Sequence, residues 1–271
     1  MPDTDTQQAA ITVRNLNSHY ADRQVLFDIN LTVRRREILA VMGQSGSGKT
    51  TFFRHLLGLK EPSSGQVELL GRDLTQMARP ELFEMRKKIG VAFQNGALFS
   101  SLSVQENVEL PLREHTQLDD NTIRIMTRMK LEFMRLAEFE KYMPAQLSGG
   151  MLKRAGLARA VIMDPQLLFF DEPSAGLDPV TSAELDRLIL KLREAMNMTI
   201  VIITHELHSA FSVADRIMVL DRGRQLMVGT RDEVRASTDR RIVNMLDRRP
   251  ADDDFNPDDY FNRLTRTGAK T

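Results

Sequence analysis

The chain contains no cysteine and no tryptophan. The lack of cysteine excludes disulfides, thiolate metal sites and cysteine nucleophiles, and it fits a reducing compartment. An excess of either charge is missing as well, because 37 Lys and Arg residues balance 37 Asp and Glu residues. A chain with no net charge is not a bulk polycation, so non-specific coating of nucleic acid is not the expected function, and we expect no nucleic-acid partner.

Long hydrophobic runs are also missing from the sequence. No window approaches the roughly 18 consecutive apolar residues of a membrane helix. The first residues, Met1 to Thr6, have neither the basic start nor the apolar run of a secretory signal. We therefore expect a soluble, cytoplasmic protein whose membrane spans, if it works at a membrane, belong to other chains. A hydrophobic content of 42% in 271 residues is enough for a sizeable core.

Short apolar runs alternate with helical patterns along the chain. Buried strands are predicted by the continuous runs at 38–42, 89–93, 167–170 and 199–203. Helical spacing predicts helices over 50–57 and 185–196, with Asp178 as a cap before the second one. A hairpin turn is predicted at Asp221–Arg224. The alternation predicts an α/β fold with a mostly parallel sheet. The stretch of about 100–163 has no buried-strand run and predicts a helical insertion.

The strongest local signal is the sequence GQSGSGKT at 43–50, which matches G-x-x-x-x-G-K-[ST] between a predicted strand and a predicted helix. Glycines let the backbone fold around a phosphate, and the following helix adds the positive end of its dipole. Lys49 can reach the outer phosphates, and the Thr50 hydroxyl suits Mg²⁺, a hard cation. The expected nucleotide-binding residues here are Gly43, Gln44, Ser45, Gly46, Ser47, Gly48, Lys49, Thr50 and Thr51.

Two further segments carry chemistry. Asp171 and Glu172 follow the run at 167–170, at the end of a strand where open α/β sheets bind ligands. Asp171 is suited to hold Mg²⁺ through water, and Glu172 to act as a general base on an attacking water. Taken alone, the pair could also be a simple turn cap before Pro173. The segment 148–150 opens another predicted helix with bare N–H donors, which is a second anion site or an ordinary cap.

In their order and spacing, these motifs resemble an ABC-type ATPase over about residues 11–238. They comprise the phosphate loop, a glutamine loop at Gln94, a signature at 147–151, the pair Asp171–Glu172, a D-loop at 174–178 and a switch histidine, His205. The resemblance implies an ATPase core with a mostly parallel sheet, an antiparallel N-terminal β subdomain and an inserted helical subdomain. It implies catalytic roles for Glu172, His205 and Gln94, and Mg²⁺ ligation by Thr50, Gln94 and Asp171. It also implies stacking of adenine on Tyr20, and nucleotide contacts from Ser148, Gly149, Gly150 and Asp178.

The chain has one phosphate loop and one signature. In the family geometry these two cannot serve the same ATP within one chain. The resemblance therefore implies a head-to-tail homodimer that sandwiches two ATP molecules.

A narrower resemblance concerns the segments 93–99, 104–108 and 111–116, which are similar to the Mla/Mce branch of lipid transporters. It implies an ATPase subunit at the cytoplasmic face of a bacterial inner membrane that energises phospholipid transport between the inner and outer membranes. The implied partners are integral membrane permease subunits, an Mce-domain lipid-binding protein and a small STAS-domain protein. An ABC ATPase for another solute and a soluble ABC ATPase of cofactor assembly remain as alternatives.

Residues 239–271 form a C-terminal extension to a predicted ATPase domain at 1–238. Near its end, acidic residues at 252–254 and 258–259 lie beside Phe255, Tyr260 and Phe261. The composition fits either a solvated tail or an arm whose aromatic residues dock on the partner protomer.

Overall fold

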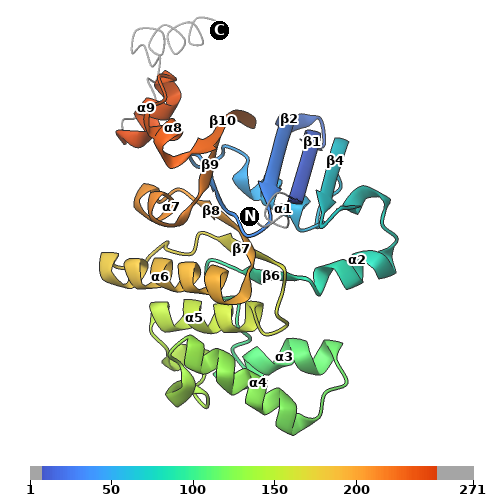
Figure 1. Cartoon of the computed structure of the whole chain (residues 1–271), viewed down its shortest axis with the longest axis vertical. Coiled ribbons are helices and arrows are strands. Elements are labelled where there is room, and N and C mark those ends of the chain that lie inside the picture. The colour runs from blue at the N-terminus through green and yellow to red at the C-terminus, as the bar shows by residue number, and fades with distance from the viewer. Residues whose placement is uncertain (1–7, 249–271) are drawn as a thin grey trace, which may run out of the picture.

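The computed structural model of the chain describes residues 8–248. Within this range the strands form one sheet in the order β5-β4-β1-β2-β10-β9-β3-β8-β7-β6 (Figure 1). The strands are β1 (Ala9–Tyr20), β2 (Arg23–Arg34), β3 (Ile38–Met42), β4 (Ser64–Leu69), β5 (Arg72–Asp73), β6 (Ile89–Ala92), β7 (Leu167–Asp171), β8 (Thr199–Thr204), β9 (Arg216–Asp221) and β10 (Arg224–Thr230).

The core of the sheet is parallel, as predicted. β3 pairs in parallel with β8 and β9, and β7 pairs in parallel with β6 and β8. The side chains of β3 alternate between two hydrophobic clusters, one on each face of the sheet. Ile38, Ala40 and Met42 belong to one cluster, and Leu39 and Val41 to the other. Burial on both faces explains why these strands read as continuous apolar runs.

The N-terminal part of the sheet is antiparallel, also as predicted. β1 pairs antiparallel with β2 and β4, and β4 with β5. β9 and β10 form the predicted hairpin, and β10 meets β2 in parallel at one pair, Arg224 and Phe27. This contact joins the antiparallel strands to the parallel core and makes one continuous sheet.

The helices are α1 (Lys49–Leu56), α2 (Arg79–Arg86), α3 (Val104–His115), α4 (Asp120–Phe133), α5 (Gly149–Ala160), α6 (Pro179–Met196), α7 (Leu207–Val213), α8 (Arg231–Arg235) and α9 (Arg240–Leu246). Between β6 and β7 the chain forms α3, α4 and α5 and no strand, which is the helical content expected for about 100–163. In Figure 1, α3 and α4 lie at the end of the molecule away from β1 and β2. None of the helices within residues 8–248 combines the length and the apolar character needed to cross a membrane.

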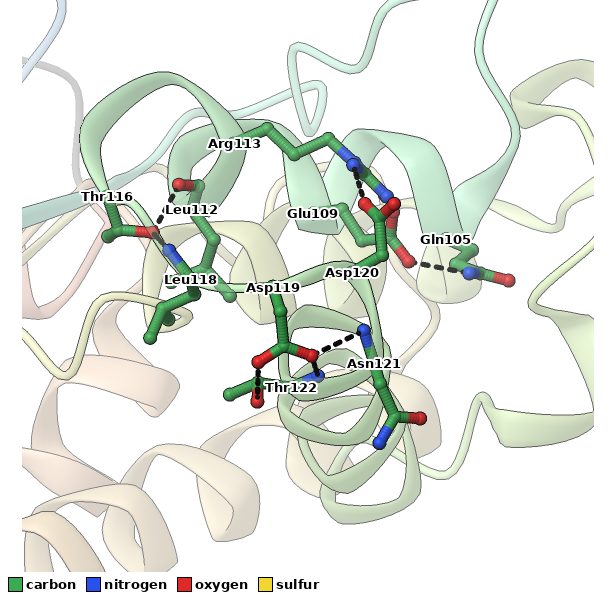
Figure 2. A network of polar contacts seen from close by, with 10 residues as sticks. All are labelled: Gln105, Glu109, Leu112, Arg113, Thr116, Leu118, Asp119, Asp120, Asn121 and Thr122. Atoms are coloured by element: carbon green, nitrogen blue, oxygen red, sulfur yellow. Dashed lines mark hydrogen bonds and ion pairs between the residues drawn. The ribbon is translucent and has the colours of Figure 1, made fainter.

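A polar network joins α3 to α4 (Figure 2). The carboxylate of the buried Glu109 accepts hydrogen bonds from Gln105, at 2.5 Å, and from two guanidinium nitrogens of Arg113, at 2.8 and 3.0 Å. Arg113 also donates to Asp120 at the start of α4, at 2.7 Å, while Asp119 caps that helix. The network fixes how the two helices meet. It also uses Arg113, a residue of the Mla/Mce-like segment, for a contact inside the chain.

Candidate active site

The phosphate loop connects β3 to α1. Gly46 and Gly48 have φ values of +79° and +102°, in the left-handed region that glycine adopts without strain. A Cβ at Gly43 would lie 2.2 Å from the carbonyl oxygen of Leu220, so β9 leaves no room for a side chain there. Within residues 8–248, no side chain caps the N-terminus of α1. The N–H donors of its first turn are therefore available to an anion.

Lys49 folds back over this loop. Its Nζ donates to the carbonyl oxygens of Gly43, at 2.6 Å, and Gln44, at 3.0 Å. Burial lowers the pKa of Lys49, and the charges of Glu172 and Asp171 raise it. In the same loop the Ser47 hydroxyl is buried and has no hydrogen-bond partner in the part of the chain that the structure describes. A buried ammonium, an unsatisfied hydroxyl and an uncapped helix N-terminus fit a site for phosphate groups.

The acidic pair lies at the end of β7. Burial raises the pKa of Asp171, the neighbouring Glu172 raises it further, and Lys49 lowers it. Glu172 has a φ of +50°, and its N–H donates to the carbonyl oxygen of Ile203 at 2.8 Å. A left-handed residue other than glycine is strained, and it persists only where its surroundings hold it. Here the strain serves to turn the chain sharply at the expected general base.

His205 contacts the Glu172 carboxylate twice. The Oε2 atom of Glu172 lies 2.8 Å from His205 Nδ1 and accepts the His205 backbone N–H at 3.2 Å. The Glu172 side chain is 14% exposed and the His205 side chain 55% exposed. His205 therefore fixes the carboxylate from the rim of the site, while its own ring stays accessible.

One cleft collects most of the predicted residues. It is lined by Val25, Gln44, Ser45, Gly46, Gly48, Lys49, Thr50, Thr51, Gln94, Asp171, Glu172, Ile203 and His205. The structure thus brings the phosphate loop, the glutamine loop, the acidic pair and the switch histidine to one place. The expected Mg²⁺ ligands Thr50, Gln94 and Asp171 share this cleft, and their side chains offer the oxygen donors that a hard cation prefers.

Tyr20 lies outside the lining of this cleft. Tyr20, at the end of β1, is 41% exposed, and the Nζ of Lys60 lies 4.2 Å from its ring centroid. Arg54 donates to its hydroxyl at 3.3 Å. The side chain thus stands beside α1, and adenine stacking on it stays a prediction.

The signature and the D-loop form a second group, which also does not line the cleft. Ser148 caps α5 by accepting the N–H of Met151, and Asp178 caps α6 by accepting two backbone N–H groups. A Cβ at Gly150 would lie 2.7 Å from Thr181 Cγ2, so the N-termini of these two helices pack closely. Gly149 belongs to the same first turn of α5. Ser148, Gly149, Gly150 and Asp178 are therefore close to one another and separate from the phosphate loop of their own chain.

The C-terminal extension supplies residues that the sequence pattern did not reveal. A cavity beside the phosphate loop is lined by Gly43, Gln44 and His205 together with Asn244, Met245 and Arg248. These last three come from α9 and the residues just after it, so the extension begins next to the candidate site. The acidic and aromatic residues that fit either a solvated tail or a docking arm lie outside the described residues.

Residues 26–175 match the ABC transporter family, over a range that contains the phosphate loop, Gln94, the signature and the acidic pair. The chain belongs to the ABC transporter family.

Individual members of this family show which transport ATPases the chain is similar to. The chain is 40% identical to the intermembrane phospholipid transport system ATP-binding protein MlaF of Haemophilus influenzae, over 88% of this chain and 90% of that one. It is 39% identical to the probable ribonucleotide transport ATP-binding protein mkl of Mycobacterium leprae, over 88% of this chain and 68% of that one. These matches confirm the predicted MlaF-like ABC ATP-binding subunit.

A solved ABC structure also resembles this fold. The ATP-binding cassette MJ0796, a dimer in a post-hydrolysis state bound to ADP and phosphate, has a TM-score of 0.74 and 29% sequence identity, over 81% of this chain and 98% of that one. The predicted ABC-type α/β fold is thereby confirmed. ABC ATPases form dimers, as that structure shows for one of them.

Proposed function

We propose that this ABC ATPase energises the transport of phospholipid between the inner and outer membranes of a bacterium. The similarity to MlaF over nearly the whole of both chains supports the cargo. The cleft that joins the phosphate loop, Gln94, Asp171–Glu172 and His205 supports ATP hydrolysis, and it is the observation on which the proposal rests.

The functional group of each residue in the cleft determines its role in ATP binding or hydrolysis. The N–H groups at the start of α1 and the ammonium of Lys49 bind the phosphates of ATP. Thr50, Gln94 and Asp171 would hold Mg²⁺, which when bound offsets the negative charge of the phosphates. Glu172 accepts a proton from the attacking water, and His205 holds the Glu172 carboxylate in place through its ring and its backbone N–H. Tyr20 stacks on the adenine.

The second half of each site comes from a second copy of the chain. Ser148, Gly149, Gly150 and Asp178 do not line the cleft that holds Lys49. The remaining backbone N–H donors of the first turn of α5, beyond the one that Ser148 caps, suit the outer phosphates of a nucleotide bound by another protomer. Two chains arranged head to tail then enclose two ATP molecules, and the C-terminal extension docks on the neighbouring protomer.

We place this dimer at the cytoplasmic face of the inner membrane, bound to permease subunits, with an Mce-domain protein and a small STAS-domain protein in the same system. Exposed aromatic side chains in and near the Mla/Mce-like segment support a docking surface for the permease. Phe83, Phe93 and Phe99 are 48%, 41% and 53% exposed. Exposed large apolar side chains are candidates for contact with a partner protein.

A second cargo has its own support. The identity to mkl, whose name refers to ribonucleotide transport, is 39% against 40% for MlaF. Identity alone therefore does not separate the two solutes. The complex purified with its permease is expected to contain bound phospholipid, detectable by mass spectrometry. Stimulation of its ATPase by ribonucleotides, with no lipid bound, would favour the other cargo, and failure to co-purify with any permease would favour a soluble ATPase.

The ATPase part is tested by Glu172→Gln. The amide keeps the shape of the side chain but does not accept a proton, so turnover is expected to fall about 10²–10⁴-fold while ATP binding is retained. Glu194→Gln, at an exposed position of α6, is the matched control and is expected to turn over normally. Normal turnover by Glu172→Gln would remove Glu172 from the role of base.

A further inference from the structure

Helix α5 carries the signature at its N-terminus and a half-buried lysine five residues after the cap. The Nζ of Lys153 donates to the carbonyl oxygens of Pro173 and Ala175, both at 2.6 Å. It also reaches the carbonyl oxygen of Glu172, at 3.4 Å. An ammonium has three donors and no acceptor, so the three carbonyls match its hydrogen-bonding capacity.

The segment that Lys153 holds is the one that carries the general base. It begins at Glu172, with its left-handed φ of +50°, and runs on into the D-loop. Such a backbone persists only where its surroundings over-determine it. The N–H of Glu172 is fixed by Ile203. Lys153 holds the carbonyl side of the turn, through a long contact of 3.4 Å to Glu172 and short ones of 2.6 Å to the two carbonyls that follow in the segment. Hydrogen bonds from a charged donor are stronger than neutral ones, so Lys153 is a strong restraint on this turn.

The same segment is anchored on its other side by a buried polar chain. The hydroxyls of Ser174 and Ser209 lie 3.0 Å apart, and Ser209 donates to Asp186 at 2.5 Å. All three residues are buried. The D-loop is therefore held to α6 and α7 by its side chain and to α5 by its backbone, so a displacement of α5 acts on the turn at Glu172.

Helix α5 also packs against the loop that follows Gln94. Arg159 donates to the carbonyl oxygen of Gly96 at 3.0 Å, and a Cβ at Gly156 would lie 2.8 Å from Gly96 Cα. The C-terminal half of α5 thus contacts the glutamine loop, and Lys153 of the same helix contacts the turn at Glu172.

We propose that Lys153 is a positioning residue that fixes the backbone of Glu172 and ties the general base of one ATP site to the signature helix that serves the other. This inference rests on the proposed head-to-tail ATPase. Burial lowers the pKa of Lys153 and the charge of Glu172 raises it, as expected for an ammonium held close to the site. Lys153 does not line the cleft, so it acts through Glu172 and not on the nucleotide.

The test compares Lys153→Met, Lys153→Gln and Lys153→Arg in the full chain, with Lys141→Met as the matched control at an exposed position of the same helical region. Small displacements of a catalytic group can cost about 10²-fold in rate. Lys153→Met is therefore expected to lower kcat about 10- to 100-fold, while the KM for ATP and the binding of a fluorescent ATP analogue change less than about 3-fold. Lys153→Arg, which can still donate to several carbonyls, is expected to recover most of the turnover, and Lys141→Met to behave as wild type.

Two results would overturn the inference. One is normal kcat in Lys153→Met. The other is a parallel loss of ATP binding, melting temperature and turnover in both Lys153→Met and Lys153→Gln, which would make Lys153 a residue of structural importance only. Wild type and Glu172→Gln are measured beside them. If wild type does not hydrolyse ATP, the proposed function fails. If wild type hydrolyses ATP, Glu172→Gln does not, and Lys153→Met turns over at the wild-type rate, the positioning role alone fails.

Discussion

Replacing Gly156 with alanine tests how closely α5 packs on the glutamine loop. The new Cβ would lie 2.8 Å from both the Cα and the carbonyl oxygen of Gly96, which are backbone atoms and cannot rotate away. Overpacking of this kind costs about 1–3 kcal/mol. Alanine is favoured over glycine in a helix by about 1 kcal/mol, which offsets part of the cost. Because both contacted atoms belong to the backbone, we expect the cost of overpacking in the upper part of its range, which leaves a net loss of stability of about 1–2 kcal/mol.

The assay is urea unfolding of the full chain, with ATP turnover as a second measurement. The matched control is Gly149→Ala in the same helix, where the added Cβ would meet only Leu177 Cδ2 at 4.0 Å, an ordinary contact. This control is expected to be as stable as wild type or slightly more so. Gly156→Ala is also expected to turn over ATP more slowly, because the loop after Gln94 must shift. Stability of Gly156→Ala equal to that of the control, together with turnover equal to that of wild type, would refute the close backbone contact.

Three other predictions concern pH and buried polar groups. Burial lowers the pKa of His55 from its ordinary value of 6.5 to about 4. The folded state therefore keeps this ring neutral. The contribution of His55 to the free energy of unfolding is full above pH 6.5 and falls by about 3 kcal/mol as the pH drops to 4, at about 1.4 kcal/mol per pH unit. Urea midpoints across this range and the NMR titration of the ring measure this loss, and a ring that titrates near pH 6.5 would contradict it. Burial raises the pKa of Asp186 while its hydrogen bond from Ser209 lowers it, with burial the larger effect. The ionised carboxylate thus destabilises the folded state at high pH. The melting temperature of Asp186→Asn minus that of wild type is therefore expected to rise from pH 4 to pH 8. A difference that stays constant over this range would contradict the prediction. Glu109→Ala leaves the exposed Arg113 without its buried partner, and we expect the free energy of unfolding in urea to fall by about 1–2 kcal/mol, with ATP binding retained. An unchanged urea midpoint would show that the network does not stabilise the fold.

The parallel core was predictable because its strands are buried on both faces. The run 38–42 contains no polar residue, and in β8 the only polar residues are Thr199 and Thr204 at its two ends. The hydrophobic pattern of the sequence did not predict β1, and the structure gives a physical reason. The pairing of β1 with β2 shifts register at several points, and Asn15 has a φ of +49°, so bulges break the alternation of polar and apolar side chains.

Some residues of the candidate site were likewise predictable from the sequence, and others were not. The phosphate loop, the acidic pair and His205 were predictable because phosphate chemistry needs particular residue types at fixed spacing. Lys153 was not, because its partners are backbone carbonyls 19–22 residues away, and any residue type supplies a carbonyl. The placement of α9 beside Gln44 and His205 follows from tertiary packing and likewise leaves no local pattern in the sequence. The contacts of Tyr20 with Lys60 and Arg54 are also tertiary, so sequence spacing alone could not show them.

The central claim is that one ATP is held by the phosphate loop of one chain and the signature of another. Co-expression of Lys49→Ala chains with Ser148→Arg chains tests it most directly, because each pure dimer lacks both sites while a mixed dimer keeps one. The account predicts almost no turnover from either variant alone and recovery to about a quarter of the wild-type rate in a random mixture, where half of the dimers are mixed and each has one intact site. No recovery, with both variants folded and mixed dimers present, would contradict it.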